Sequence, residues 1–263
     1  MPQMLSIGSV GALVTDLQQK LNLLPSNLVR LVADGIFGPK TKARVVEFQG
    51  QNNLSPDGVV GPLTWEQLIQ LVAQISGNFQ NNLGRMAVVG VAKAEAGLGG
   101  VFAKQSGGPD PQNPKRQFRK GHLRLLKYFR IAAPKPGAPN QTFFNEDTIR
   151  YLTTPGQLAP MAHWCGIFAL WAIRTAGMAV GTWVQGGGIS NVAGFRQITS
   201  AAVGAGDVGF IGQPFQHHFI IDQVFDQNGV RTASTIEGNS APNSNFSFQN
   251  RPLSSINAFY TCF

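Results

Sequence analysis

The chain has 263 residues, of which 43% are apolar and 13% are charged, and its formal net charge is +8 at pH 7. This composition excludes a disordered chain, and the length allows one large domain or two small ones. Its two cysteines, Cys165 and Cys262, are too few for a disulfide framework and match no zinc-binding spacing. One bridge between them is compatible with the sequence, although a free thiol at Cys165 fits the residues around it better.

The N-terminal sequence bears on where the protein works. Residues 1–20 lack the basic segment and apolar run of a secretory signal, and no apolar run of the chain is long enough for a membrane span. We therefore expect synthesis in the cytoplasm without a signal peptide. A target outside the cytoplasm would then require a non-classical route of delivery.

A short repeat marks the first part of the chain. The sequence DGIFGPKT, at Asp34–Thr41, recurs as DGVVGPLT at Asp57–Thr64. In each copy an Asp-Gly turn leads through Gly-Pro into a helix, which suits glycine's access to positive φ and proline's tolerance of early helical positions. Apolar spacing predicts helices over residues 10–21, 39–49 and 62–72. The expected core residues are Leu13, Leu17, Leu21, Val45, Val46, Phe48, Trp65, Leu68 and Leu71.

Two longer motifs extend this pattern. G-x-x-V-x-x-L-Q-x-x-L covers Gly11–Leu21, and D-G-x-F-G-P-x-T continues to Phe48 and Gln49. Both resemble the small three-helix peptidoglycan-binding domain found on many wall hydrolases. The resemblance implies a domain over residues 1–76 that attaches the chain to peptidoglycan and performs no chemistry. A helical bundle without a ligand is the alternative.

The middle of the chain is less regular. We expect helices at 83–96 and 122–131, loops at 99–114 and 132–140, and a linker near 76–82. The stretch 115–135 is basic and contains no acidic residue. A solvated helix face is favoured over a polyanion site there, and no nucleic-acid-binding motif accompanies the charge.

The residues around Cys165 suggest chemistry. His163–Gly177 reads as a helix with the thiol in its first turn. The positive end of a helix dipole lowers a thiol pKa, and the free N–H groups there are able to hold an oxyanion. The alternative is that Cys165 is a small buried apolar residue.

Strands are predicted further along the chain. Asp207-Val208 leads into one strand, residues 216–224 form a second with His217 and His218, and Asn228-Gly229 predicts a hairpin into a third. The third strand ends at Glu237 and Asn239. A thiolate, an imidazole and a polar group that orients the imidazole are what a cysteine hydrolase needs.

The order W-C, G-D-V, H-x-φ-I-I and I-E-G-N resembles the CHAP family of cysteine, histidine-dependent amidohydrolases and peptidases. The resemblance implies an α+β fold: the three-helix bundle followed by a papain-like domain with an antiparallel sheet over residues 83–263. It also implies no metal and no organic cofactor.

The resemblance also implies roles for single residues. Cys165 is then the nucleophile, Glu237 orients the base, Asn239 assists, and Trp164 contacts the substrate. Either histidine fits as the base, and the apolar positions after it favour His217. Because neighbouring strand residues face opposite sides, we expect only one of His217 and His218 to meet the thiol.

Together these residues predict a peptidoglycan amidase or endopeptidase that acts at the cell wall. The alternatives are a non-catalytic wall-binding protein and a wall-tethered cysteine peptidase acting on protein. A phage lysin or an effector delivered by a secretion machine would explain a missing export signal, and an effector would imply an immunity protein as partner.

Overall fold

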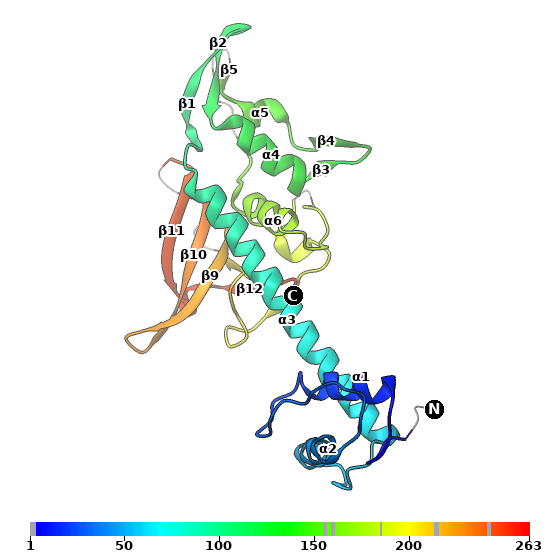
Figure 1. Cartoon of the computed structure of the whole chain (residues 1–263). Coiled ribbons are helices and arrows are strands. Elements are labelled where there is room, and N and C mark those ends of the chain that lie inside the picture. The colour runs from blue at the N-terminus through cyan, green and yellow to red at the C-terminus, as the bar shows by residue number, and fades with distance from the viewer. Residues whose placement is uncertain (1–3, 155–156, 159–160, 185, 213–215, 241–242) are drawn as a thin grey trace. The chain divides into compact units, whose positions relative to one another are not determined.

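The computed structural model describes residues 4–154, 157–158, 161–184, 186–212, 216–240 and 243–263 (Figure 1). Two compact units make up the chain, Met1–Asn81 and Asn82–Phe263. The division lies between the two expected domains, inside helix α3 (Pro62–Gly97), which contributes residues to both units. The boundary therefore falls within the expected linker at 76–82, but this segment is helical and not a loop. That segment contains one Gly and no Pro, so nothing in it forces a helix to end.

The first unit contains three helices, as the apolar spacing predicts: α1 (Ala12–Leu21), α2 (Pro39–Gln51) and the beginning of α3. Its core includes Leu17, Phe48 and Leu68. Leu13 is 46% exposed, contrary to expectation, and Val14 takes the buried position instead. On α1 the helical period places Val14, not Leu13, on the face that Leu17 and Leu21 share.

A buried glutamine explains each copy of the repeat. The side-chain amide of Gln18 donates to Asp34, to the carbonyl of Ile36 and to Thr41, and its oxygen accepts from the Gly35 N–H. Gln18 is 1% exposed, so these bonds satisfy a polar group that would be costly to bury alone.

The second copy repeats this arrangement. Gln49 donates to Asp57, to the carbonyl of Val59 and to Thr64, and accepts from the Gly58 N–H. Gly35 and Gly58 have φ of 75° and 73°, the left-handed region that glycine enters without strain. Each D-G-x-x-G-P-x-T segment is therefore a turn tied to the preceding helix by one glutamine.

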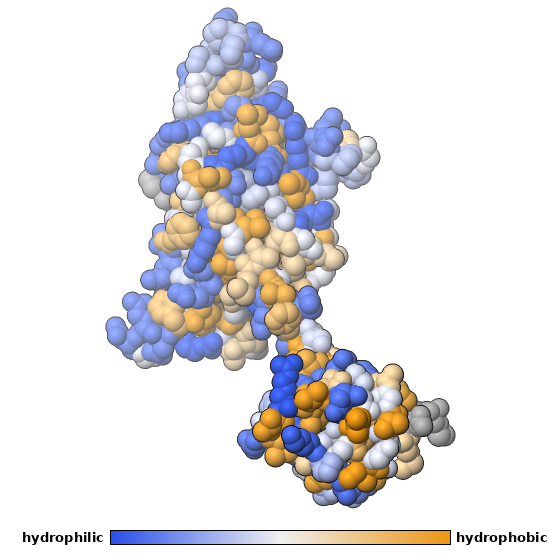
Figure 2. Space-filling view, in the orientation of Figure 1, coloured by the Kyte–Doolittle hydropathy of each residue, from blue (hydrophilic) through white to orange (hydrophobic). Residues whose placement is uncertain are grey.

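Apolar side chains are also exposed on this unit. Val10, Val29 and Val32 are each more than 70% exposed, and Figure 2 shows apolar patches on the visible face of the unit. The first unit thus presents apolar as well as polar surface to a ligand.

The second unit is α+β, with antiparallel pairing throughout its described sheets. Its largest sheet has the order β11-β10-β9-β8-β12-β7, and the others are β1-β2-β5-β6 and β3-β4. The helices are α4 (His122–Ala132), α5 (Glu146–Arg150) and α6 (Cys165–Thr175), with short 3-10 turns at Ile189–Asn191 and Leu253–Ser255. The strands are β1 (Phe102–Asp110), β2 (Asn113–Lys120), β3 (Pro134–Lys135), β4 (Ala138–Thr142), β5 (Tyr151–Thr154), β6 (Gln157–Leu158), β7 (Arg196–Ile198), β8 (Val208–Ile211), β9 (His217–Gln227), β10 (Val230–Ser240), β11 (Asn245–Pro252) and β12 (Ala258–Thr261).

Helix α6 is the centre of this unit. It packs against β9 and β10 and also against α4 (Figure 1). Residues Cys165 to Ile173 are all buried, as the apolar sequence CGIFALWAI requires. Rings of Tyr128, Phe168 and Trp171 pack against one another at the interface between α4 and α6. This core fixes the N-terminus of α6 relative to the strands that carry the histidines.

Both expected loops of the middle region are wrong in part. Residues 102–120 form the β1–β2 hairpin, whose pairing register shifts three times. Its sequence is polar and rich in Gly and Pro, so the alternation that announces a strand is missing. Residues 134–142 form the β3–β4 hairpin, which turns through Pro136 and Gly137, with Gly137 at φ 74°.

The basic stretch 115–135 is likewise not one helix face, because it covers β2, α4 and β3. Several of its arginines form ion pairs: Arg116 with Asp147, Arg124 with Glu95, and Arg130 with Glu146. Among the residues that the structure describes, no helix is long and apolar enough to cross a membrane.

The glutamine in each repeat makes a testable contribution to stability. Replacing Gln49 by Ala leaves the Gly58 N–H and other turn groups without their partner, which should destabilise the first unit by about 2–4 kcal/mol. We expect faster amide hydrogen exchange across α1 and α2 in Gln49→Ala. The control is Gln51→Ala, at the exposed end of the same helix. Equal exchange in the two variants would show that the glutamine bonds do not hold the repeat together.

Candidate active site

Cys165 opens a pocket in the second unit. It is the first residue of α6, and its side chain lines a cavity of about 400 Å³. The lining residues are Phe144, Ala162, His163, Cys165, Gly166, Trp183, Gly186, Gly187, Gln216 and His218. The helix expected to place Cys165 in its first turn is confirmed. Its free N–H groups and the positive end of its dipole therefore face this cavity, which we call the Cys165 pocket.

Both histidines interact with the thiol. Burial by itself raises the pKa of Cys165, but hydrogen bonds from His217 and His218 outweigh burial and lower that pKa to about 5. The Cys165 sulfur lies 3.9 Å from the carbonyl oxygen of Gln216, the residue just before β9. The thiol thus sits at the end of the strand and not over one of its faces. The expectation that only one histidine meets Cys165 is wrong for this reason.

A chain of alternating charges continues from His217. Its Nε2 lies 2.8 Å from Oε2 of Glu237, so Nδ1 is the nitrogen left for the thiol. Burial lowers the pKa of His217, but hydrogen bonds with Cys165 and Glu237 raise it to about 9. Arg251, on β11, makes two hydrogen bonds to the Glu237 carboxylate, of 2.6 and 2.9 Å.

Glu237 is a carboxylate despite its burial. It is 1% exposed, and burial raises its pKa, but hydrogen bonds from His217, Arg251 and Thr235 lower that pKa to about 2. A thiolate, an imidazolium, a carboxylate and a guanidinium therefore alternate through the site. Buried charges that alternate in this way offset one another's desolvation.

The other histidine lies inside the Cys165 pocket. His218 is 6% exposed, and its ring meets Trp183 edge-on at 5.7 Å. A Cβ on Gly166 would lie 2.4 Å from the Trp183 ring and 3.2 Å from Nδ1 of His218. Only glycine after Cys165 lets these two rings approach the start of the helix.

Two predicted site residues have other surroundings. Asn239 interacts with His163, at 3.2 Å between the amide nitrogen and Nδ1, and accepts a hydrogen bond from Ser244. Among the described contacts Asn239 has none with His217. Trp164 is 0% exposed and donates from its indole to Ser244. The expectation that Trp164 contacts substrate is wrong, because its ring packs in the core against Phe246.

The sequence patterns missed Arg251, Thr235 and His163. Arg251 lies in a polar strand where a lone cation normally faces solvent, so no local signal marks it. His163 carried a signal, since it stands two residues before Cys165. Cys262, the second cysteine, is a free thiol whose pKa burial raises to about 11.

Comparisons with known proteins identify the first unit. Residues 10–68 match the family described as "Putative peptidoglycan binding domain". The peptidoglycan-binding resemblance of this part of the chain is therefore confirmed. The resemblance of residues 83–263 to the CHAP family stays a prediction.

Several relatives share a part of this sequence. A zinc D-Ala-D-Ala carboxypeptidase of Streptomyces albus G is 43% identical over 67 residues, which are 26% of each chain. An uncharacterized protein of Kitasatospora aureofaciens is 63% identical over 35 residues, 13% of this chain and 30% of that one. A solved structure from Clostridium acetobutylicum, a fused Zn-dependent amidase/peptidase with a peptidoglycan-binding domain, is 36% identical over 26% of this chain and 29% of that chain, with a TM-score of 0.23. The chain thus spans less than a third of the length of each.

The name of the Streptomyces albus G relative raises the question of zinc. Among the residues that the structure describes, no group of three His, Cys, Asp or Glu side chains is arranged to hold a metal ion. The donors nearest Cys165 are instead engaged with one another, as the bond between His217 and Glu237 illustrates. This part of the chain does not fit a zinc site.

The two cysteines should become reactive at very different pH. Alkylation of Cys165 by iodoacetamide should rise as pH passes about 5, because its thiolate forms there, whereas Cys262 should react only towards pH 11. Peptide mass mapping of chains alkylated between pH 4 and 11 separates the two sites. Reaction of both cysteines at the same pH would contradict the arrangement of charges.

Glu237 should keep the pKa of His217 high. In Glu237→Gln the carboxylate that stabilises the imidazolium is lost, so the pKa of His217 falls and the pKa of Cys165 rises. We expect alkylation of Cys165 by iodoacetamide near pH 6 to slow by about tenfold or more, because less of the thiol is ionised. The measurement is a pH–rate profile of this alkylation beside Asp147→Asn, an exposed carboxylate of the same unit. Thermal unfolding of each variant shows whether the chain remains folded, and an unchanged profile would remove Glu237 from the site.

Proposed function

We propose that this protein hydrolyses an amide bond of peptidoglycan, with Cys165 as nucleophile and His217 as acid and base. The observation that carries the proposal is the Cys165–His217–Glu237 arrangement, which adjoins a pocket in a chain whose residues 10–68 match a peptidoglycan-binding family. The order of these residues is that of the CHAP family, so the second unit is proposed to be papain-like.

The proposed reaction has two halves. In the first, the thiolate of Cys165 attacks the carbonyl carbon, and the amide breaks as the imidazolium of His217 gives its proton to the leaving amine. A thioester remains on Cys165. In the second, neutral His217 takes a proton from water, the hydroxide adds to the thioester, and the carboxylic acid leaves as the thiolate re-forms.

Other groups support these steps. Glu237 keeps Nδ1 of His217 directed at the thiol, because it occupies Nε2. The N-terminus of α6 offers free backbone N–H groups to the negative oxygen of the tetrahedral intermediate. His218 and His163 line the pocket and are placed to contact substrate. Asn239 assists by holding His163.

The first unit is proposed to hold the protein at its substrate. Its proposed role is to attach the chain to peptidoglycan, so that the second unit works at high local substrate concentration. The protein then acts at the cell wall. Delivery as a phage lysin, or by a secretion machine with an immunity protein as partner, stays a prediction from the sequence.

The decisive experiment compares the protein with Cys165→Ala on isolated sacculi, followed by mass analysis of released fragments. We expect new amino and carboxyl termini with the protein and none with Cys165→Ala, because only the first has a nucleophile. The masses distinguish a bond between muramic acid and alanine from a bond within the peptide.

Two other outcomes would overturn the proposal. If both proteins bind sacculi and neither releases fragments, the protein is a wall-binding protein without this activity. If an unfolded protein such as casein is cut faster than sacculi, the substrate is protein. Cys262→Ala is the matched control, since Cys262 does not line the pocket.

A further inference from the structure

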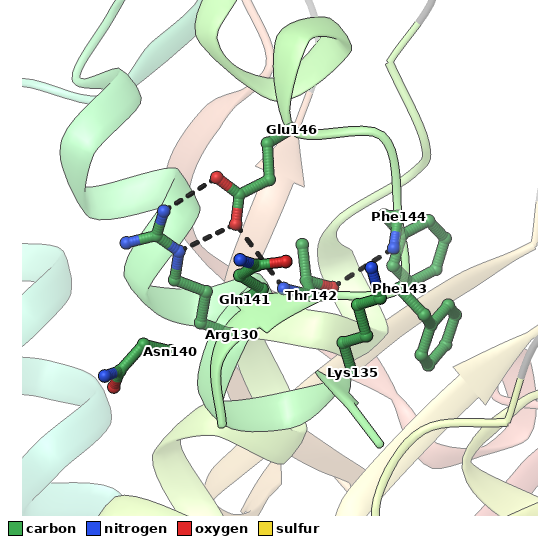
Figure 3. Close-up of a pocket in the computed structure, with 8 residues that line it drawn as sticks. All are labelled: Arg130, Lys135, Asn140, Gln141, Thr142, Phe143, Phe144 and Glu146. Carbon is green, nitrogen blue, oxygen red and sulfur yellow. Dashed lines mark hydrogen bonds and ion pairs between the residues drawn. The ribbon is translucent and has the colours of Figure 1, made fainter. Parts of the chain in front are cut away.

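A second cavity adjoins the Cys165 pocket. It has a volume of about 620 Å³ and lies beside the β3–β4 hairpin and the start of α5 (Figure 3). Phe144 lines both cavities. Phe144 therefore borders both spaces, and we call the second one the hairpin cavity.

The charge of the hairpin cavity favours an anion. Arg130 and Arg150 both bind the Glu146 carboxylate, and Arg130 does so through two hydrogen bonds of 2.8 and 2.7 Å (Figure 3). Hydrogen bonds from Arg130 lower the pKa of Glu146 to about 2, so it is ionised. Arg150 is not one of the residues that line the cavity, so within the lining the charge of Arg130 is balanced by that of Glu146.

Lys135 gives the lining of the cavity its one excess positive charge. It is exposed on β3 and lines the cavity, and no ion pair joins it to a carboxylate among the described residues. An ammonium group without a protein partner beside a cavity is free to bind a carboxylate from a ligand.

The remaining walls indicate a peptide rather than a bare ion. Asn140 and Gln141 on β4 supply side-chain amides, which both donate and accept hydrogen bonds. Phe143 and Phe144 stack with their ring centroids 4.6 Å apart and provide an apolar wall. Amide groups, an apolar wall and a cation together suit a short peptide that ends in, or carries, a carboxylate.

We propose that the hairpin cavity binds a free carboxylate of the peptidoglycan stem peptide while the bond to be cut lies at Cys165. This inference rests on the proposed function, because it names the part of the substrate that flanks the reacting bond. A carboxylate held by Lys135 fixes which amide of the stem reaches the thiol, so the cavity acts as a specificity site.

The test measures how well soluble muropeptides protect Cys165 from iodoacetamide, using initial rates and the full-length chain. One muropeptide has free carboxylates and the other has the same carboxylates amidated. Lys135→Gln should raise the concentration of the free acid needed for half-protection by roughly three- to tenfold. It should leave protection by the amidated ligand unchanged. Lys115→Gln, an exposed lysine on β2 outside the cavity, is the matched control.

Each result separates this inference from the proposed function. Protection that is equal for both ligands, unchanged by Lys135→Gln or absent altogether overturns the carboxylate site, even if sacculi are cut. Lack of fragment release from sacculi overturns the hydrolase, and that assay is independent of protection. Alkylation without ligand should be the same in Lys135→Gln and the unsubstituted chain, since Lys135 does not touch the thiol.

Discussion

The buried carboxylate of Glu237 is the constraint on which the candidate site depends. A carboxylate that is 1% exposed is costly unless cations pair with it, and here Arg251 and His217 both do. The imidazolium that results stabilises the thiolate of Cys165. Removing any one member takes a charged partner from its neighbour, so the four groups form one electrostatic unit.

Four elements of the second unit bring these charged groups together. Helix α6 brings Cys165, β9 brings His217, β10 brings Glu237 and β11 brings Arg251. Because β9, β10 and β11 are hydrogen-bonded neighbours, three of the four groups lie on adjacent strands. The aromatic core around Tyr128, Phe168 and Trp171 holds α6 in place, and thereby the thiol. Helices and strands, rather than loops, position these four groups.

The first unit is stabilised by the hydrogen bonds of two buried glutamines. It has one glutamine for each copy of its repeat, and each glutamine satisfies the polar groups of a turn that would otherwise be buried without partners. The repeat is therefore visible in the sequence because each copy solves the same hydrogen-bonding problem. The middle of the chain has no such local solution. In its β1–β2 hairpin the pairing register shifts and apolar residues do not alternate with polar ones. The sequence pattern therefore predicted a loop there.

The sequence by itself determined the elements whose signals are local. These are the three helices of the first unit, the helix that starts at Cys165, and the strands around Asn228-Gly229. Turn chemistry and apolar periodicity act over a few residues, so a pattern suffices to find them. Only the tertiary structure decided how distant residues meet. It placed the thiol at the end of β9, where both histidines reach it. It also paired Arg251 on β11 with Glu237 on the neighbouring strand β10. It also buried Trp164 and opened a cationic cavity beside Phe144, because contacts between segments far apart in the chain depend on packing that no local pattern encodes.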